Sequence, residues 1–133
     1  MKTMIQYWLP PVFWAGLIYF FSSIPGLSSG LDYDTLLRKT AHVVEYFILT
    51  FLIYRAFKRT WNLDPLSLLF YPAMISFIYA VSDELHQLNV PNRHGAVEDI
   101  WIDSLGVALC WVCMANKEII LKIFSHKDTK VLK

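Results

Sequence analysis

The chain has 133 residues, of which 56% are hydrophobic, 16% aromatic and only 17% charged, and its mean hydropathy is +0.41. About a quarter of the residues of an ordinary soluble domain are charged, so this composition indicates a small single-domain membrane protein. The formal net charge of +1 argues against a nucleic-acid partner, which would need a large basic surface. Two cysteines exclude a disulfide scaffold and a cysteine-rich zinc module.

Four stretches with few charges, over residues 4–21, 41–54, 66–81 and 97–115, predict helices near residues 4–21, 38–56, 66–87 and 97–115. About 20 apolar residues cross a hydrocarbon layer roughly 30 Å thick. A lipid-exposed backbone has to bond within its own helix, and turn-forming residues separate the stretches. We therefore expect an all-α membrane protein, a bundle of four transmembrane helices that forms one domain over residues 1–133.

The first stretch raises two questions of its own. Pro10 and Pro11 predict a kink or a late helix start. Phe21 occupies a position that signal-peptide cleavage needs small, so we expect a retained helix rather than a removed leader.

The basic residues set the expected direction of the bundle. With a cytoplasmic N-terminus, nine of the twelve Lys and Arg residues fall on the inner side, and only Arg38, Lys39 and Arg93 fall outside. We therefore expect both termini in the cytoplasm. Residues 116–133 form a basic cytoplasmic tail, either a helix lying on the anionic inner leaflet or a solvated terminus.

Small residues in the fourth stretch predict how it packs. Gly106 and Ala108 favour close contact with another helix. Cys110 and Cys113 form a C-x-x-C pattern, but within an apolar helix they indicate packing rather than redox chemistry.

Most of the remaining polar and ionisable residues fall at the outer ends of the last three helices. They are Arg38, Lys39, His42 and Glu45, then Asp83, Glu84, His86 and Gln87, then Arg93, Asp99 and Asp103. Charged side chains at membrane depth are costly and usually face a bundle interior or a wet cavity. We therefore expect a polar pocket between the second, third and fourth helices that opens to the outside.

Acid–base chemistry is the first function that this pocket suggests. Histidine side chains titrate near neutrality, and Glu45 or Asp83 can fix the tautomer of His42 or His86 or share a proton with it. The candidate catalytic residues are His42, Glu45, Asp83, His86 and Asp99.

Substrate binding is the role expected of the other pocket residues. Arginine forms bidentate bonds with phosphate or carboxylate groups. The candidate substrate-binding residues are Arg38, Lys39, Glu84, Gln87, Arg93 and Asp103.

The charge balance of the pocket leaves other roles open. With Glu98 included, three basic residues face six acidic ones, and water, protonation, a metal ion or a cationic partner would have to balance the surplus. His42 with Glu45, and Asp83 with His86, are i, i+3 pairs of the kind that bind metals in helical bundles, but there is no H-E-x-x-H motif, so we assign no metal ligands and no cofactor. Polar residues that simply join the helices are a further alternative.

The pocket residues also carry a family resemblance. The patterns are Arg38-Lys39-x-x-His42-x-x-Glu45-Tyr46, Ser82-Asp83-Glu84-x-His86-Gln87, and Pro91-x-Arg93 followed by Asp99 and Gly106, preceded by Phe21-Ser22-Ser23-x-Pro25. In this order they resemble the VanZ-like family of small bacterial membrane proteins over roughly residues 8–111. Asn92 and Asp103 depart from the family's usual Gly and Asn.

The resemblance implies a four-helix bundle in the bacterial cytoplasmic membrane and a link to teicoplanin resistance. It implies as partners the membrane lipids and a lipid-linked cell-wall precursor or glycopeptide, with no nucleic acid. We expect a pocket on the extracytoplasmic side that binds or chemically alters such a head group. A non-catalytic accessory protein is the main alternative. A carrier or channel would require several copies, and neither enzyme activity nor oligomeric state follows from the sequence.

Overall fold

Four helices make up the computed structural model, which describes residues 2–25, 34–91 and 97–131. They are α1 (Lys2–Ser22), α2 (Asp34–Thr60), α3 (Pro65–Gln87) and α4 (Val97–Val131). No strand occurs within these ranges, which confirms the all-α prediction and its four helices. α2 and α4 are clearly longer than predicted, because the helical backbone continues into their charged flanks, whereas α1 and α3 match the predicted bounds to within two residues.

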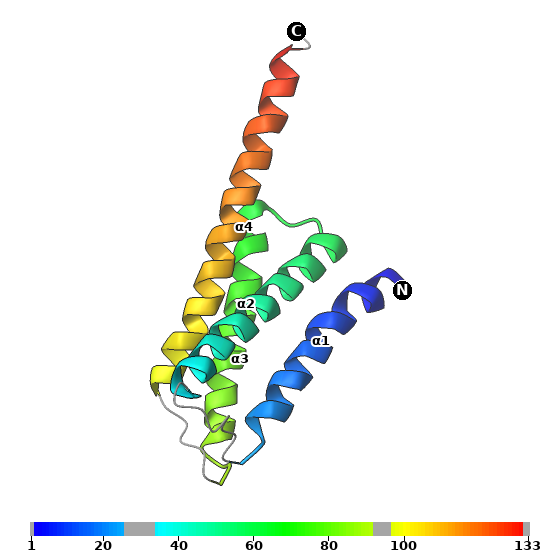
Figure 1. The fold of residues 1–133 in the computed structure, drawn as a ribbon. Helices are drawn as coiled ribbons and strands as arrows, with labels where there is room; N and C mark the ends of the chain where they lie inside the picture. The colour runs from blue at the N-terminus through cyan, green and yellow to red at the C-terminus, as the bar shows by residue number, and fades with distance from the viewer. Residues whose placement is uncertain (1, 26–33, 92–96, 132–133) are drawn as a thin grey trace.

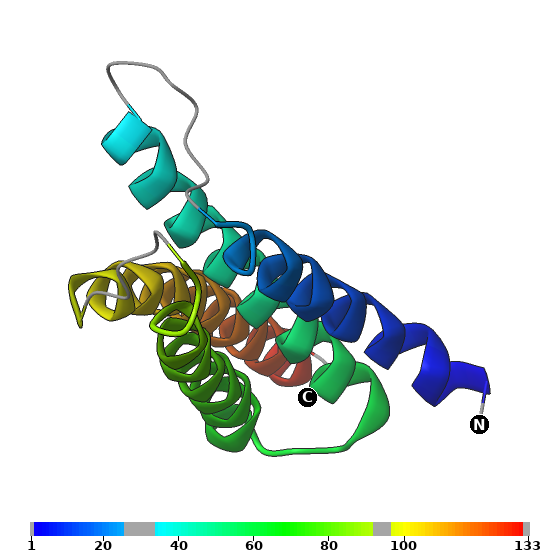
Figure 2. The ribbon, with the colours of Figure 1, turned by 90° about the horizontal axis from the view of Figure 1, so that it is seen from below.

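The helix α2 lies at the centre of the arrangement. It packs against α1 on one side and against α4 on the other, and both also contact α3. Figures 1 and 2 show α2 between α1 and α4, which do not contact each other in the described residues. Figure 1 also shows α4 extending well beyond the other helices.

Two side chains bond α1 to the backbone of its neighbours. Trp14 donates from its indole Nε1 to the carbonyl of Glu45 on α2 over 3.0 Å, and Tyr79 on α3 donates to the carbonyl of Ala15 over 2.7 Å. The helix begins ahead of Pro10 and Pro11 and runs through both. The prolines therefore do not delay its start.

The start of α3 follows from its first residues. Asp64 accepts hydrogen bonds from the backbone N–H groups of Leu66 and Ser67, each over 3.0 Å, and Pro65 occupies the first helical position. A carboxylate satisfies N–H groups that the helix itself leaves unpaired, and proline suits a position that needs no donor. Asp64 and Pro65 therefore fix where α3 begins.

The exterior of the bundle is strongly apolar. Phe13, Ile78 and Trp101 are 64%, 59% and 73% exposed, while Asp99 and Asp103 are only 4% and 0% exposed. Soluble proteins bury acidic residues rarely and seldom expose large contiguous apolar surface. By length and composition, one helix of the described residues, α3, qualifies as a candidate membrane span. The spans expected for α1, α2 and α4 stay predictions.

Aromatic and basic side chains gather where the start of α1 meets the end of α2. Trp8 packs edge-on against Phe57 and Trp61, with ring centroids 5.4 and 5.3 Å apart. Arg55 and Arg59 lie over the ring of Tyr7, at 5.5 and 5.9 Å from its centroid. This combination is typical of a membrane–water interface on the basic side.

A polar contact at the same end joins α2 to α4. Lys58 and Tyr54 both donate hydrogen bonds to the carboxylate of Glu118, and Lys58 also donates to the Tyr54 hydroxyl over 3.1 Å. Burial alone would raise the pKa of Glu118, but these bonds lower it below its ordinary value of 4.5. Burial opposes the charged form of Lys58, but the same bonds raise its pKa above 10.5.

The contact between α2 and α4 is closest at Gly106. A Cβ atom at this position would lie 2.3 Å from the carbonyl oxygen of Val43 and 3.1 Å from the backbone nitrogen of Phe47. Such distances leave no room for any side chain. The predicted close contact is therefore confirmed at Gly106, whereas Ala108 is exposed.

We expect Gly106→Ala to push α4 away from α2 and to lower the melting temperature of the purified protein in detergent. Gly16→Ala is the matched control, because a Cβ at Gly16 meets nothing within 4 Å. Alanine there raises helix propensity by about 0.5–1 kcal/mol, so its melting temperature should not fall. Equal melting temperatures for wild type and Gly106→Ala would contradict the close contact.

The Lys58–Glu118 contact predicts a pH dependence of stability. Because the pKa of Glu118 is lowered by folding, its contribution is present above the ordinary value of 4.5 and is lost as the pH falls through the folded-state pKa. Thermal unfolding should therefore show that Glu118→Gln loses less stability than wild type between neutral and acidic pH. Identical pH profiles would show that the contact contributes nothing.

Candidate functional site

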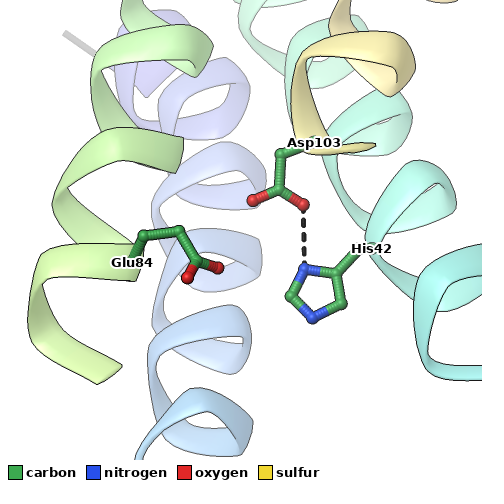
Figure 3. Close-up of side chains that lie close together, drawn as sticks. All are labelled: His42, Glu84 and Asp103. Carbon is green, nitrogen blue, oxygen red and sulfur yellow. Dashed lines mark hydrogen bonds and ion pairs between the residues drawn. The ribbon is translucent and has the colours of Figure 1, made fainter. Parts of the chain in front are cut away.

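Three buried side chains from three helices meet at the end of the bundle where α3 finishes and α4 begins. His42 on α2, Glu84 on α3 and Asp103 on α4 are 8%, 3% and 0% exposed. Each offers a ligand-type atom within 4.8 Å of the others. Figure 3 shows the three side chains pointing toward one another. Helix packing thus brings together residues that lie up to 61 positions apart.

A hydrogen bond between His42 and Asp103 connects α2 to α4. The Nδ1 atom of His42 lies 2.8 Å from Oδ1 of Asp103. An ionised carboxylate only accepts, so the Nδ1–H of the ring donates. In a neutral ring this leaves Nε2 as the proton acceptor, and Figure 3 shows this nitrogen pointing away from Asp103.

Further carboxylates surround this pair. Asp83 is 4% exposed and accepts a hydrogen bond from the amide of Gln87 over 3.1 Å. Asp83 and Asp99 both lie within electrostatic range of Asp103. At least one carboxylate or imidazole from each of the three clusters is therefore buried at this end of the bundle.

Three buried polar atoms of the cluster have no hydrogen-bond partner within the described residues. They are Oδ2 of Asp103, Oδ1 of Asp83 and the hydroxyl of Tyr46. Tyr46 is 0% exposed and lies within electrostatic range of Asp83, Glu84 and Asp103. A buried polar atom without a partner is costly, so these atoms mark the interior as a place for a polar ligand.

Three other sequence-predicted residues lie on α2 within about one turn of His42. Arg38 and Lys39 are partly buried about one helical turn before His42. Glu45 is also partly buried and within electrostatic range of His42. Arg93 lies outside the described residues.

His86 faces a different neighbour. Its ring stacks on Tyr19 with centroids 4.4 Å apart, and its Nε2 lies 2.9 Å from the hydroxyl of Ser23. That hydroxyl donates to the carbonyl of Tyr19 over 2.7 Å, so it accepts from the Nε2–H of His86. The two histidines therefore present opposite ring nitrogens as donors and belong to separate contacts.

Helix geometry explains why the i, i+3 pairs His42 with Glu45 and Asp83 with His86 do not form the cluster. Residues two positions apart on a helix point about 200° apart, so His86 faces α1 while Glu84 faces the interior. The sequence suggested Glu45 or Asp83 as the partner that fixes a histidine tautomer. In the structure Asp103, which the sequence assigned to substrate binding, is the residue bonded to His42.

The sequence interpretation gave no role to Ser23 or Tyr19. Spacing along one helix reveals which residues share a face, but it does not reveal which face of another helix they meet. The Phe21-Ser22-Ser23 pattern was the available signal, since it places a hydroxyl at the C-terminal end of α1.

The fold and the site together define a four-helix protein with an apolar exterior and a polar cluster enclosed by three of its helices. The chain belongs to the VanZ/LLP1 family, which it matches over residues 3–121. The predicted family is therefore confirmed. Comparison with curated proteins and with solved structures found no match.

We expect His42→Ala to lower the free energy of unfolding by about 3–5 kcal/mol, because it leaves Asp103 as a buried carboxylate without its donor. His86→Ala is the control, since it removes one hydrogen bond at a partly buried site and should cost about 1 kcal/mol. Denaturant titration in mixed micelles measures both. Equal losses of unfolding free energy in the two variants would contradict a larger contribution of the buried His42–Asp103 pair to stability.

Proposed function

We propose that all four helices span the bacterial cytoplasmic membrane, with both termini in the cytoplasm. The apolar exterior supports this arrangement, since large hydrophobic side chains are exposed on every helix. The aromatic and basic residues around Trp8 and Arg59 lie opposite the His42 cluster and suit the inner interface. This orientation puts the cluster of His42, Glu84 and Asp103 at the extracytoplasmic end.

Within this topology the cluster binds, and chemically alters, an anionic head group that is lipid-linked or associated with the cell wall. The observation that carries this proposal is the buried His42–Asp103 pair beside Glu84. Ionisable groups inside a membrane bundle are expensive and usually serve function. Membership of the VanZ/LLP1 family supports a link to glycopeptide susceptibility.

The geometry gives each residue a part in such chemistry. Asp103 holds the Nδ1–H of His42, so Nε2 takes a proton from a water or hydroxyl nucleophile. Arg38 lies one turn nearer the start of α2, where a guanidinium suits a phosphate or carboxylate group. Burial removes competing water and strengthens these electrostatic interactions.

A purely structural role is the second candidate, and the same bond favours it. The His42–Asp103 contact joins α2 to α4, as polar residues in membrane bundles often do. In that case conservative changes would reduce the amount of folded protein and not a separate activity.

The test is to express the chain in a glycopeptide-susceptible bacterium and to measure teicoplanin susceptibility together with protein abundance in the membrane. We expect wild type to reduce susceptibility and His42→Gln and Asp103→Asn to abolish this protection at unchanged abundance. Both variants keep a group able to bond across the pair. Glu118→Gln, a carboxylate change at the opposite end, should protect as wild type does.

The outcomes separate the candidates. Loss of His42→Gln and Asp103→Asn from the membrane would favour the structural role. Full protection by both variants at normal abundance would contradict a role for the pair in the activity.

A further inference from the structure

Negative charge accumulates inside the bundle. Three carboxylates, those of Asp83, Asp99 and Asp103, are each 4% exposed or less. Among the side chains that the structure describes, no lysine or arginine is buried with them. Buried carboxylates need protons, a cationic partner or a metal ion to balance them. His42 can supply one positive charge only.

The positions of three buried side chains fit a metal ion. The ligand atoms of His42, Glu84 and Asp103 lie within 4.8 Å of one another and come from three different helices. Two ligand atoms about 2.1 Å from a tetrahedral Zn²⁺ ion are about 3.4 Å apart. The 2.8 Å between Nδ1 of His42 and Oδ1 of Asp103 is a hydrogen-bond distance, so the ion would replace the bridging proton and move these two atoms about 0.6 Å apart.

Unpartnered atoms give a second and independent indication. Oδ2 of the fully buried Asp103 has no hydrogen-bond partner in the described part of the chain, and Figure 3 shows the carboxylate of Asp103 turned toward the side of Glu84. The hydroxyl of the fully buried Tyr46 is likewise without a partner there, although it is within electrostatic range of both carboxylates. A water bound to a cation would donate a hydrogen bond to the oxygen of that hydroxyl.

We propose that His42, Glu84 and Asp103 bind one divalent cation, with Zn²⁺ as the best fit. One imidazole and two carboxylates suit zinc, and three protein ligands leave a coordination position open, as in catalytic zinc sites. The open position suits an oxygen of a phosphate or carboxylate group, so this use of the cation rests on the proposed function. In the cation-bound state His42 acts as a ligand rather than as a base.

This site differs from the one that helix spacing suggested. The i, i+3 pairs would have used Glu45 and His86, whereas the cluster takes one ligand from each of three helices. His86 bonds to Ser23 and stacks on Tyr19, so it provides an internal control for histidine-dependent binding.

The experiment uses the purified full chain in detergent micelles, stripped with a chelator and without any head group. Equilibrium dialysis against Zn²⁺ followed by elemental analysis should show one bound ion per chain. His42→Gln, Glu84→Gln and Asp103→Asn should each weaken binding by about 100-fold, since even changes to groups that only support metal ligands cost about 10- to 100-fold. His86→Gln and Glu118→Gln should bind as wild type does.

Co²⁺ in place of Zn²⁺ gives a spectroscopic check. Its visible absorption bands should form with wild type and be lost in the three ligand variants. Circular dichroism and gel filtration establish that each variant is folded. If His42→Gln misfolds, Glu84→Gln is the deciding variant, because the Glu84 substitution leaves the His42–Asp103 bond in place.

Equal affinity in wild type and the ligand variants, or no bound ion in wild type, would overturn the inference. The result is independent of the susceptibility test. If the chain binds Zn²⁺ through these ligands but gives no protection against teicoplanin, the cation site is supported and the proposed function is contradicted. Protection without cation binding contradicts the inference alone.

Discussion

The bond between His42 and Asp103 is the interaction on which the interior of this protein depends. It crosses from α2 to α4 in a space where both side chains are nearly or fully buried. Each group alone would be an uncompensated polar or charged group in a low-dielectric interior. The hydrogen bond compensates both buried groups, and it also holds the imidazole of His42 in one orientation. Stability and the proposed chemistry thus depend on the same two residues.

That bond is possible because two backbones come unusually close. Gly106 lies three residues after Asp103, and it faces the carbonyl of Val43, the residue after His42. Any larger residue would separate the helices at the level where the side chains have to meet. Gly106 therefore sets the distance between the backbones of α2 and α4, and this distance allows His42 and Asp103 to bond.

The fold could be predicted largely from composition and charge, whereas the site could be predicted only in part. Four apolar stretches separated by turn residues predicted four helices. The polar residues at their flanks indicated which ends of the last three helices would lie together. Which residues pair across helices depends on how each helix is rotated about its axis. Spacing on a single helix could therefore group His86 with Asp83, although the fold turns His86 toward Tyr19 and Ser23. Asp103 was recognised as a pocket residue, but its partner came from a helix 61 residues away.

One continuous helix links the two polar contacts of the bundle. α4 carries Asp103 in its second turn and Glu118, bonded to Lys58, further along the same helix. The 15 positions between them correspond to about 22 Å of unbroken helix. An α-helix of this length behaves as a stiff rod, so a tilt imposed where Glu118 is held would displace Asp103 relative to the imidazole on α2. The polar contacts at the two ends of the α2–α4 interface are in this sense mechanically coupled.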